Sequence, residues 1–320
     1  SPWWSIEKFR PEMRRFKLPR FTLRRFHRYP LLAMAMLLFA HGAMAERIIH
    51  KEKSLYRNIV VSQKANRRCL VFSIKRQQRN QTCIDTKNKN RIIFSYVQMT
   101  FAGLLANPEP RRALMIGMGG GTISNVLTAI YPELHIDLVE VDQAVVNVAK
   151  EYFGFVETEK TQVHVSDGRV FTKRALLKGN QYDLVILDAF TGEYIPEHMM
   201  TKEFLQDVDS LLTPDGVVVA NTFTGSSLYD HESVTYTQVF GPFLNLKMPG
   251  SGNRVIVATK SGLPDNKTLS SNAMMLASRF EPYNIDLQRF VPKLRRDPDW
   301  DTGKRPLTDQ YAPANLLKGR

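Results

Sequence analysis

Cysteine is scarce in this sequence, and long apolar runs and clustered histidines are scarce as well. The chain of 320 residues has two cysteines, Cys69 and Cys83, so no more than one disulfide bond can form within it. The apolar run at residues 31–40 is about half as long as a membrane-spanning helix, which needs roughly twenty residues. The seven histidines show no spacing typical of metal ligands, and we expect no metal site.

Acidic residues are too few to balance the basic ones, and the net charge is +13. Most of the excess lies near the front, with +7 in residues 1–30 and +10 in residues 46–92. Residues 93–320, with 22 basic and 26 acidic side chains, are mildly acidic, which suits a cationic substrate. The basic residues are not interleaved with a recognisable recognition motif. We interpret them as a solvated face and expect no specific nucleic-acid partner.

Residues 1–45 have the pattern of a leader. Nine basic residues precede the apolar run, and Ala43-Met44-Ala45 supplies the small residues found before a signal-peptidase site. If the segment is cleaved on export, the mature protein is periplasmic or otherwise exported. If the segment is retained, its basic and apolar character predicts membrane contact, and the sequence does not decide between a membrane-associated and a cytoplasmic location.

Residues 46–107 are predicted to form a small β domain of hairpins. Short β-prone segments separated by polar residues lie at 58–62, 69–74, 82–85 and 92–95. The two cysteines are centred on residue 76, inside a polar stretch, so a simple hairpin sets them opposite each other. A disulfide bond and two free buried thiols both fit this pattern, depending on the compartment. An apolar helix over 96–105 and a proline-containing linker at 107–110 follow.

Residues 113–142 have the sequence pattern of a nucleotide-binding βαβ unit. A short apolar strand at 113–116 runs directly into Gly117, Gly119, Gly120 and Gly121, where the missing Cβ lets the backbone turn tightly and approach a ligand. Apolar residues then recur at helical spacing up to Pro132, and a strand over 135–141 follows. Glu140 falls 19 residues after Gly121, about where such folds place a carboxylate on ribose hydroxyls.

From residue 111 onward, predicted strands and helices alternate, which indicates an α/β fold with a parallel sheet. Expected strands lie at 163–165, 182–187, 217–221 and 255–259, and expected helices at 144–153, 169–177 and 201–212, the last with Thr201 as its N-cap. Ligands of such sheets bind at the carboxyl ends of the strands. Carboxylates end three successive strands there: Glu140 and Asp142, then Asp167, then Asp188.

Several of these motifs together resemble the spermidine synthase family, the polyamine aminopropyltransferases. They are the glycine run, the acidic VEVD, Ser166-Asp167-Gly168, and the YDLVILDAF that ends at Phe190. Residues 307–313 are similar to the closing motif of a bacterial spermidine-synthase-like branch. The resemblance implies a Rossmann-like methyltransferase-type domain at 108–320, a small N-terminal β domain and a homodimer.

Carried over residue by residue, the resemblance implies a site for an adenosyl donor and an amine. Glu140 holds the ribose, Asp167 and Gly168 lie at the adenine, and the remaining donor contacts are Gly117, Gly119, Gly121 and Asp142. Asp188 is the catalytic carboxylate, because an ammonium must lose a proton before it attacks the carbon next to a sulfonium. Tyr96 is implied as its hydrogen-bonding partner. The donor is decarboxylated or ordinary S-adenosylmethionine, and the acceptor is a polyamine or another amine such as putrescine.

The sequence also departs from the family pattern. Gly120 stands where the family has an aspartate that binds the donor's amine, and Thr191 stands where it has the second aspartate of the loop after Asp188. Arg57 replaces a glutamine and Val97 a histidine. Glu193 is a candidate to replace a lost carboxylate, so Thr191 and Glu193 are expected at the substrate.

Other functions fit the same scaffold, because a fold does not fix a function. An S-adenosylmethionine-dependent methyltransferase is the first alternative, and a non-catalytic protein that binds adenosyl compounds or polyamines is the second. A nicotinamide oxidoreductase fits least, since Thr122 replaces the last glycine of the dinucleotide fingerprint.

Overall fold

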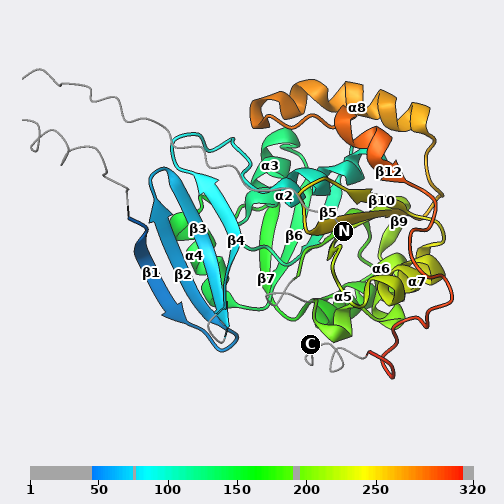
Figure 1. Cartoon of the computed structure of the whole chain (residues 1–320), viewed down its shortest axis with the longest axis horizontal. Coiled ribbons are helices and arrows are strands. Elements are labelled where there is room, and N and C mark those ends of the chain that lie inside the picture. The colour runs from blue at the N-terminus through cyan, green and yellow to red at the C-terminus, as the bar shows by residue number, and fades with distance from the viewer. Residues whose placement is uncertain (1–44, 75–76, 190–194, 313–320) are drawn as a thin grey trace, which may run out of the picture. The chain divides into compact units, whose positions relative to one another are not determined.

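The computed structural model describes residues 45–74, 77–189 and 195–312 (Figure 1). The predicted leader lies outside the described residues except for Ala45, and so do Thr191 and Glu193. Residues from Ala45 onward form one compact unit with two sheets. Within the described residues, no helix combines the length and the apolar character needed to cross a membrane.

The N-terminal sheet has four antiparallel strands in sequence order: β1 (Arg47–Lys53), β2 (Asn58–Lys64), β3 (Arg67–Ile74) and β4 (Gln77–Asp85). Alternating apolar residues of β2 and β3, such as Ile59 and Leu70, pack against Val145 and Val148 of helix α4 (Gln143–Tyr152). The predicted strands at 58–62, 69–74 and 82–85 are thus confirmed, though each is longer. The predicted strand at 92–95 is wrong, because Ile92 makes only an isolated bridge to Ile84 and helix α2 (Ser95–Thr100) begins directly after.

Cys69 and Cys83 are joined by a disulfide bond. The two residues are direct cross-strand partners of β3 and β4, with Cα atoms 4.1 Å apart. They pack with Val60 and Val71 on the face of the sheet opposite to α4. Of the two alternatives that the sequence leaves open, the structure has the paired one.

The main sheet has eight strands in the order β12-β10-β11-β9-β8-β5-β6-β7 (Figure 1). Its parallel part holds β5 (Arg112–Ile116), β6 (His135–Glu140), β7 (Thr161–Val165), β8 (Tyr182–Leu187) and β9 (Leu212–Phe223). The antiparallel part adds β10 (Leu244–Lys247), β11 (Asn253–Thr259) and the short β12 (Leu294–Arg295). From β5 the chain moves outward to β6 and β7, and it then returns on the other side to β8 and β9. The switch point of the sheet therefore lies between β5 and β8, where such folds bind ligands.

Helices cover both faces of this sheet (Figure 1). On one face lie α2, a 3-10 turn η1 (Phe101–Leu105), α3 (Thr122–Ile130) and α8 (Asn266–Phe280). On the other lie α5 (Gly168–Leu177), α6 (Lys202–Ser210) and α7 (Tyr229–Phe240). Thr201 caps α6 as predicted, its hydroxyl accepting from the Phe204 amide. The α/β class and the methyltransferase type of the sheet are confirmed; β1, β10, β12, α7 and α8 were not predicted.

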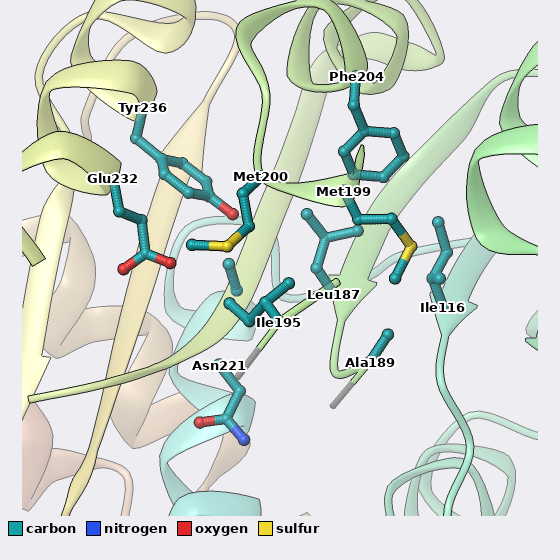
Figure 2. A pocket seen from close by; sticks show the side chains of 11 residues that line it. Ile116, Leu187, Ala189, Ile195, Met199, Met200, Phe204, Asn221, Glu232 and Tyr236 are labelled. Atoms are coloured by element: carbon teal, nitrogen blue, oxygen red, sulfur yellow. The ribbon is translucent and has the colours of Figure 1, made fainter. Parts of the chain in front are cut away.

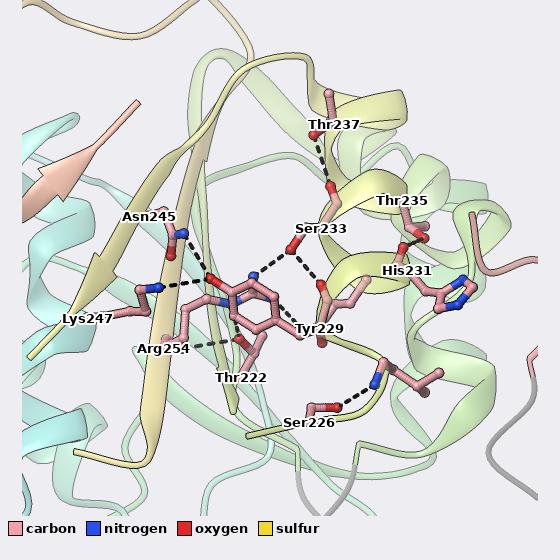
Figure 3. A network of polar contacts seen from close by, with 12 residues as sticks. Thr222, Ser226, Tyr229, His231, Ser233, Thr235, Thr237, Asn245, Lys247 and Arg254 are labelled. Atoms are coloured by element: carbon pink, nitrogen blue, oxygen red, sulfur yellow. Dashed lines mark hydrogen bonds and ion pairs between the residues drawn. The ribbon is translucent and has the colours of Figure 1, made fainter. Parts of the chain in front are cut away.

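A buried arginine joins α7 to the antiparallel side of the sheet (Figure 3). Arg254 of β11 has no exposed surface, and its guanidinium pairs with Glu232 of α7. It also donates to the hydroxyls of Ser233 (2.6 Å) and Thr222 (2.7 Å), and it stacks 3.9 Å from the ring centre of Tyr229. These contacts satisfy a charge that would otherwise be costly to bury, and they hold α7 on the strand that carries Asn221.

Candidate functional site

A cavity of about 230 Å³ opens at the carboxyl ends of β5, β6 and β8, at the switch point of the sheet. Seven of the predicted site residues line it: Tyr96, Gly117, Gly119, Glu140, Asp167, Gly168 and Asp188. The N-terminal sheet and its turns add Tyr56, Arg57, Phe72 and Gln81 to the wall. Gly121 and Asp142, which were also predicted as donor contacts, are not among the lining residues.

Gly117 brings the ends of β5 and β8 together. Its φ of 88° is a left-handed conformation that favours glycine, and a Cβ at this position would lie 2.4 Å from the backbone oxygen of Asp188. The Asp188 amide donates to the carbonyl of Ile116 over 2.9 Å. The glycine turn and the candidate catalytic carboxylate therefore form one rigid corner of the cavity.

The N-terminal sheet occupies the space next to Gly120. Its amide donates to Oγ1 of Thr82 over 2.9 Å, and a Cβ on Gly120 would lie 2.6 Å from Cγ2 of Thr82. There is no room for a side chain at this position while Thr82 stands there. The glycine that replaces the family's aspartate at position 120 is thus matched by Thr82, which fills the space of a side chain. Sequence reasoning missed this contact because Thr82 lies 38 residues earlier.

Glu140 ends β6 with its carboxylate almost fully buried. Oε1 accepts from the Asp142 amide over 3.1 Å, and Oε2 accepts from the Met118 amide over 3.4 Å. Burial raises the pKa of Glu140, while the nearby guanidinium of Arg57 and the two amides act in the opposite direction. A buried carboxylate that lines the cavity in this way can accept hydrogen bonds from a ligand's hydroxyl groups.

Asp142 instead holds the N-terminal sheet to the main one. Its Oδ1 accepts from the Ala144 amide as the N-cap of α4. Its Oδ2 accepts from the Ser54 hydroxyl over 2.5 Å and lies 3.8 Å from Nε of Arg57. Both oxygens are therefore occupied by protein groups. Ser54 and Arg57 lie in the turn between β1 and β2.

Asp167 caps α5 and pairs with a histidine. Oδ1 accepts from the amides of Arg169 and Val170 over 3.0 and 3.1 Å, and Oδ2 lies 2.7 Å from Nε2 of His198. Partial burial alone would raise the pKa of Asp167, but these hydrogen bonds outweigh it and the pKa is lowered. His198, for which the sequence analysis proposed no role in the site, lines the cavity. Its place in the loop that follows Asp188 was the available signal.

The loop that carries His198 is held from outside by the C-terminal segment. Arg169 donates to the carbonyl of His198 over 3.2 Å and makes two hydrogen bonds to Asp309, at 2.7 and 2.5 Å. The carbonyl of Leu307 accepts from the Lys202 amide over 2.8 Å, and the Leu307 side chain is fully buried. The described part of the predicted closing motif at 307–313 therefore supports one wall of the site.

Asp188 follows β8 directly, and its carboxylate lines the cavity and accepts one hydrogen bond from the described residues. Nδ2 of Asn221 donates to Oδ1 over 2.9 Å. Burial raises the pKa of Asp188 to about 7, with the hydrogen bond from Asn221 acting against this shift. A carboxylate with this pKa can accept a proton at neutral pH and release it again, as a general base requires.

Tyr96 stands close to Asp188 but does not hydrogen-bond it. Its hydroxyl donates to the carbonyl of Gln81 over 3.1 Å. Burial raises the pKa of Tyr96 well above its ordinary value, and the charge of Asp188 adds to the effect. Gln81 is the extra residue of a β-bulge between β3 and β4, which brings it into the cavity wall. Such a bulge leaves no clear signal in the sequence, so Gln81 was not predicted.

A second cavity, of about 20 Å³, is lined by Leu187 and Ala189, the two neighbours of Asp188 in the chain (Figure 2). Its walls are mostly apolar, with Ile195, Met199 and Met200 from the loop near His198. The polar groups around it are Asn221, Glu232 and Tyr236. The volume is sufficient for a single water molecule and not for a substrate.

The glycine turn, the buried strand-end carboxylates and the switch point define a Rossmann-like protein of the methyltransferase type. Residues 94–243 match the family model for the spermine/spermidine synthase domain. The chain is 51% identical over 293 residues to the polyamine aminopropyltransferase of Vibrio vulnificus, covering 91% of this chain and 97% of that one. It belongs to the spermine/spermidine synthase family of transferases.

Solved structures agree on the fold. A probable spermidine synthase from Corynebacterium glutamicum superposes with a TM-score of 0.61 at 18% identity, over 81% of this chain and 100% of that one. Human methyltransferase-like protein 13 in complex with SAH gives 0.52 at 24% identity, over 70% of this chain and 100% of that one. At these identities the likeness concerns architecture alone.

Proposed function

We propose that this chain transfers an aminopropyl group from decarboxylated S-adenosylmethionine to an amine acceptor such as putrescine. The observation that carries the proposal is the carboxylate of Asp188, with a pKa raised to about 7, at the corner where the glycine turn meets β8. The relative that is half identical over nearly the whole chain is named for this activity.

In the proposed reaction, the acceptor enters as an ammonium and gives a proton to Asp188. The freed lone pair attacks the methylene carbon next to the sulfonium; the new C–N bond forms as the C–S bond breaks, and the neutral thioether leaves with the bond's electrons. The sulfonium is a good leaving group, so positioning the two reactants in line is most of the remaining task. No redox partner is needed.

The other residues receive roles from their positions. Glu140, held by two backbone amides, binds the ribose hydroxyls, while Asp167 with its partner His198 and Gly168 flank the adenine. Tyr96 borders the place where amine and sulfonium meet. Contacts to the substrate from Thr191 and Glu193, and a homodimer, remain predictions; light scattering of the purified protein tests the dimer.

The proposal is tested by incubating the purified protein with a diamine and either decarboxylated or ordinary S-adenosylmethionine, with products identified by mass spectrometry. We expect an aminopropylated diamine from the decarboxylated donor. Asp188→Asn should abolish transfer and leave donor binding largely intact, whereas Glu140→Gln should weaken donor binding. Equal loss of binding in both variants would reverse the assignment of the two carboxylates.

Two outcomes would favour the alternatives. Methylated product from ordinary S-adenosylmethionine, with no product from the decarboxylated form, would indicate a methyltransferase on the same scaffold. Tight donor binding without turnover of any amine tested would indicate a non-catalytic binding protein.

A further inference from the structure

Two asparagines form a chain of hydrogen bonds that ends at the carboxylate of Asp188. Asn221 of β9 is 2% exposed and donates from Nδ2 to Oδ1 of Asp188. Asn253, the first residue of β11, donates from its own Nδ2 to Oδ1 of Asn221 over 3.0 Å. In the antiparallel pairing of β9 and β11, Asn221 lies opposite Val255. Asn253 is two residues before Val255, so the two side chains are diagonal neighbours on one face of the sheet.

We propose that Asn253 is a positioning residue for the transfer reaction, which acts by turning the donor end of the Asn221 amide toward Asp188. This inference rests on the proposed function, because Asn253 acts through Asp188, the proton acceptor of that reaction. A primary amide has a donating end and an accepting end, and only one of them can face Asp188. By occupying the accepting end, Asn253 leaves the NH₂ group for the carboxylate. The reversed amide would set its oxygen against a carboxylate oxygen.

The orientation matters because few other groups act on Asp188. Among the described residues, Tyr96 from α2 is the titratable group whose charge would act on Asp188, and it is neutral at physiological pH because the pKa of a tyrosine is high and burial raises it further. The glycine turn contributes backbone only. In the described part of the chain, no ion pair joins Asp188 to a cation. The hydrogen bond from Asn221 is therefore the protein contact that favours the ionised form against burial.

The test replaces the hydrogen-bond donor at position 253 by a side chain that can only accept. In Asn253→Asp the new carboxylate can only accept, so Asn221 turns its NH₂ group toward it and its oxygen toward Asp188. We expect the acidic limb of the pH profile of kcat/KM to move up by about one unit, which is roughly a tenfold loss on that limb. Donor affinity should be unchanged. Asn253→Leu, which removes the hydrogen bond without adding charge, should move the limb in the same direction by less.

A matched control separates orientation from simple charge. Thr224 lies at the same end of the two strands, where its hydroxyl donates to the carbonyl of Gly252 over 3.1 Å. Thr224→Asp adds a carboxylate there without a bond to Asn221, and we expect the limb to stay in place. An equal shift in Thr224→Asp and Asn253→Asp, or an unmoved limb in both Asn253 variants with lowered thermal stability only, would overturn the proposal.

The titration can also be followed without turnover. The ¹³C chemical shift of the Asp188 carboxyl, assigned by its loss in Asp188→Asn, reports its protonation in the free protein. If the wild type makes no aminopropyl product but this titration still moves in Asn253→Asp, the proposed function fails and the positioning role stands. If product forms and the titration does not move, the positioning role fails alone.

Discussion

Thr82 of the N-terminal sheet and Gly120 of the glycine turn are in direct contact. The Gly120 amide donates to the Thr82 hydroxyl over 2.9 Å, and Thr82 Cγ2 occupies the space where a side chain on Gly120 would begin. The space beside Gly120, where the family pattern has an aspartate, is thus filled by the neighbouring sheet. Restoring that aspartate therefore requires a change at Thr82 as well as at Gly120.

We therefore expect Gly120→Asp alone to lower stability by about 1–3 kcal/mol through overpacking, and to weaken donor binding. Thr82→Ala removes the atom that lies 2.6 Å from the added Cβ and should relieve most of the loss. The double variant, and not Gly120→Asp alone, should then gain preference for decarboxylated over ordinary S-adenosylmethionine. Thermal unfolding and competition calorimetry, with Thr82→Ala as control, check both statements. Full stability of Gly120→Asp would contradict the steric account.

The raised pKa of Asp188 predicts two pH dependences of opposite sign. Transfer needs the ionised carboxylate, so kcat/KM should fall about tenfold per unit below pH 7. The contribution of Asp188 to stability should fall as pH rises from about 4 to 7, because its carboxyl group keeps its proton in the folded state and loses it in the unfolded one. Asp188→Asn removes this cost and should stabilise the protein by on the order of 2 kcal/mol above pH 7 and hardly at all near pH 4. A stability difference that is constant between pH 4 and 8 would show that Asp188 titrates normally.

The parallel part of the main sheet and the strand-end acids were predictable because each rests on a local signal. Apolar strands followed at once by glycine or acid fix where Gly117, Glu140 and Asp188 stand, and parallel pairing brings those ends to one edge. Thr82, Gln81 and Asn253 enter through packing of distant segments and a β-bulge. No local pattern encodes those contacts, so the sequence alone could not place them.

The ion pair between Arg254 and Glu232 should stabilise the fold only while both charged groups are present. Removing the cation in Arg254→Gln leaves a buried, uncompensated carboxylate, and we expect a loss of about 3–5 kcal/mol in urea unfolding. Burial already raises the pKa of Glu232, so the loss should shrink at low pH, where this group can take up a proton. Lys304→Gln, which breaks the exposed pair with Asp301, is the matched control and should cost about 0–1 kcal/mol. Equal effects of the two variants would show that the Arg254 pair is not truly buried.

The bond between Cys69 and Cys83 closes a short loop, since the two residues are 14 apart in sequence. Replacing both by alanine should lower the free energy of unfolding by about 3 kcal/mol, because the unfolded chain gains freedom. Chemical unfolding with and without reductant checks this on the wild type as well. Alkylation of both thiols in protein that was unfolded without reductant would rule the bond out.

The contact of Leu307 and Asp309 with the loop around His198 also sets an order of events during synthesis. One wall of the site gains its outer support only after Leu307 and Asp309 have left the ribosome, because their partners Lys202 and Arg169 lie more than a hundred residues before them. A chain released before Leu307 contains every residue that lines the cavity but lacks this support. Such a fragment should bind its donor loosely and be degraded quickly, because the wall that carries His198 is then held from one side only.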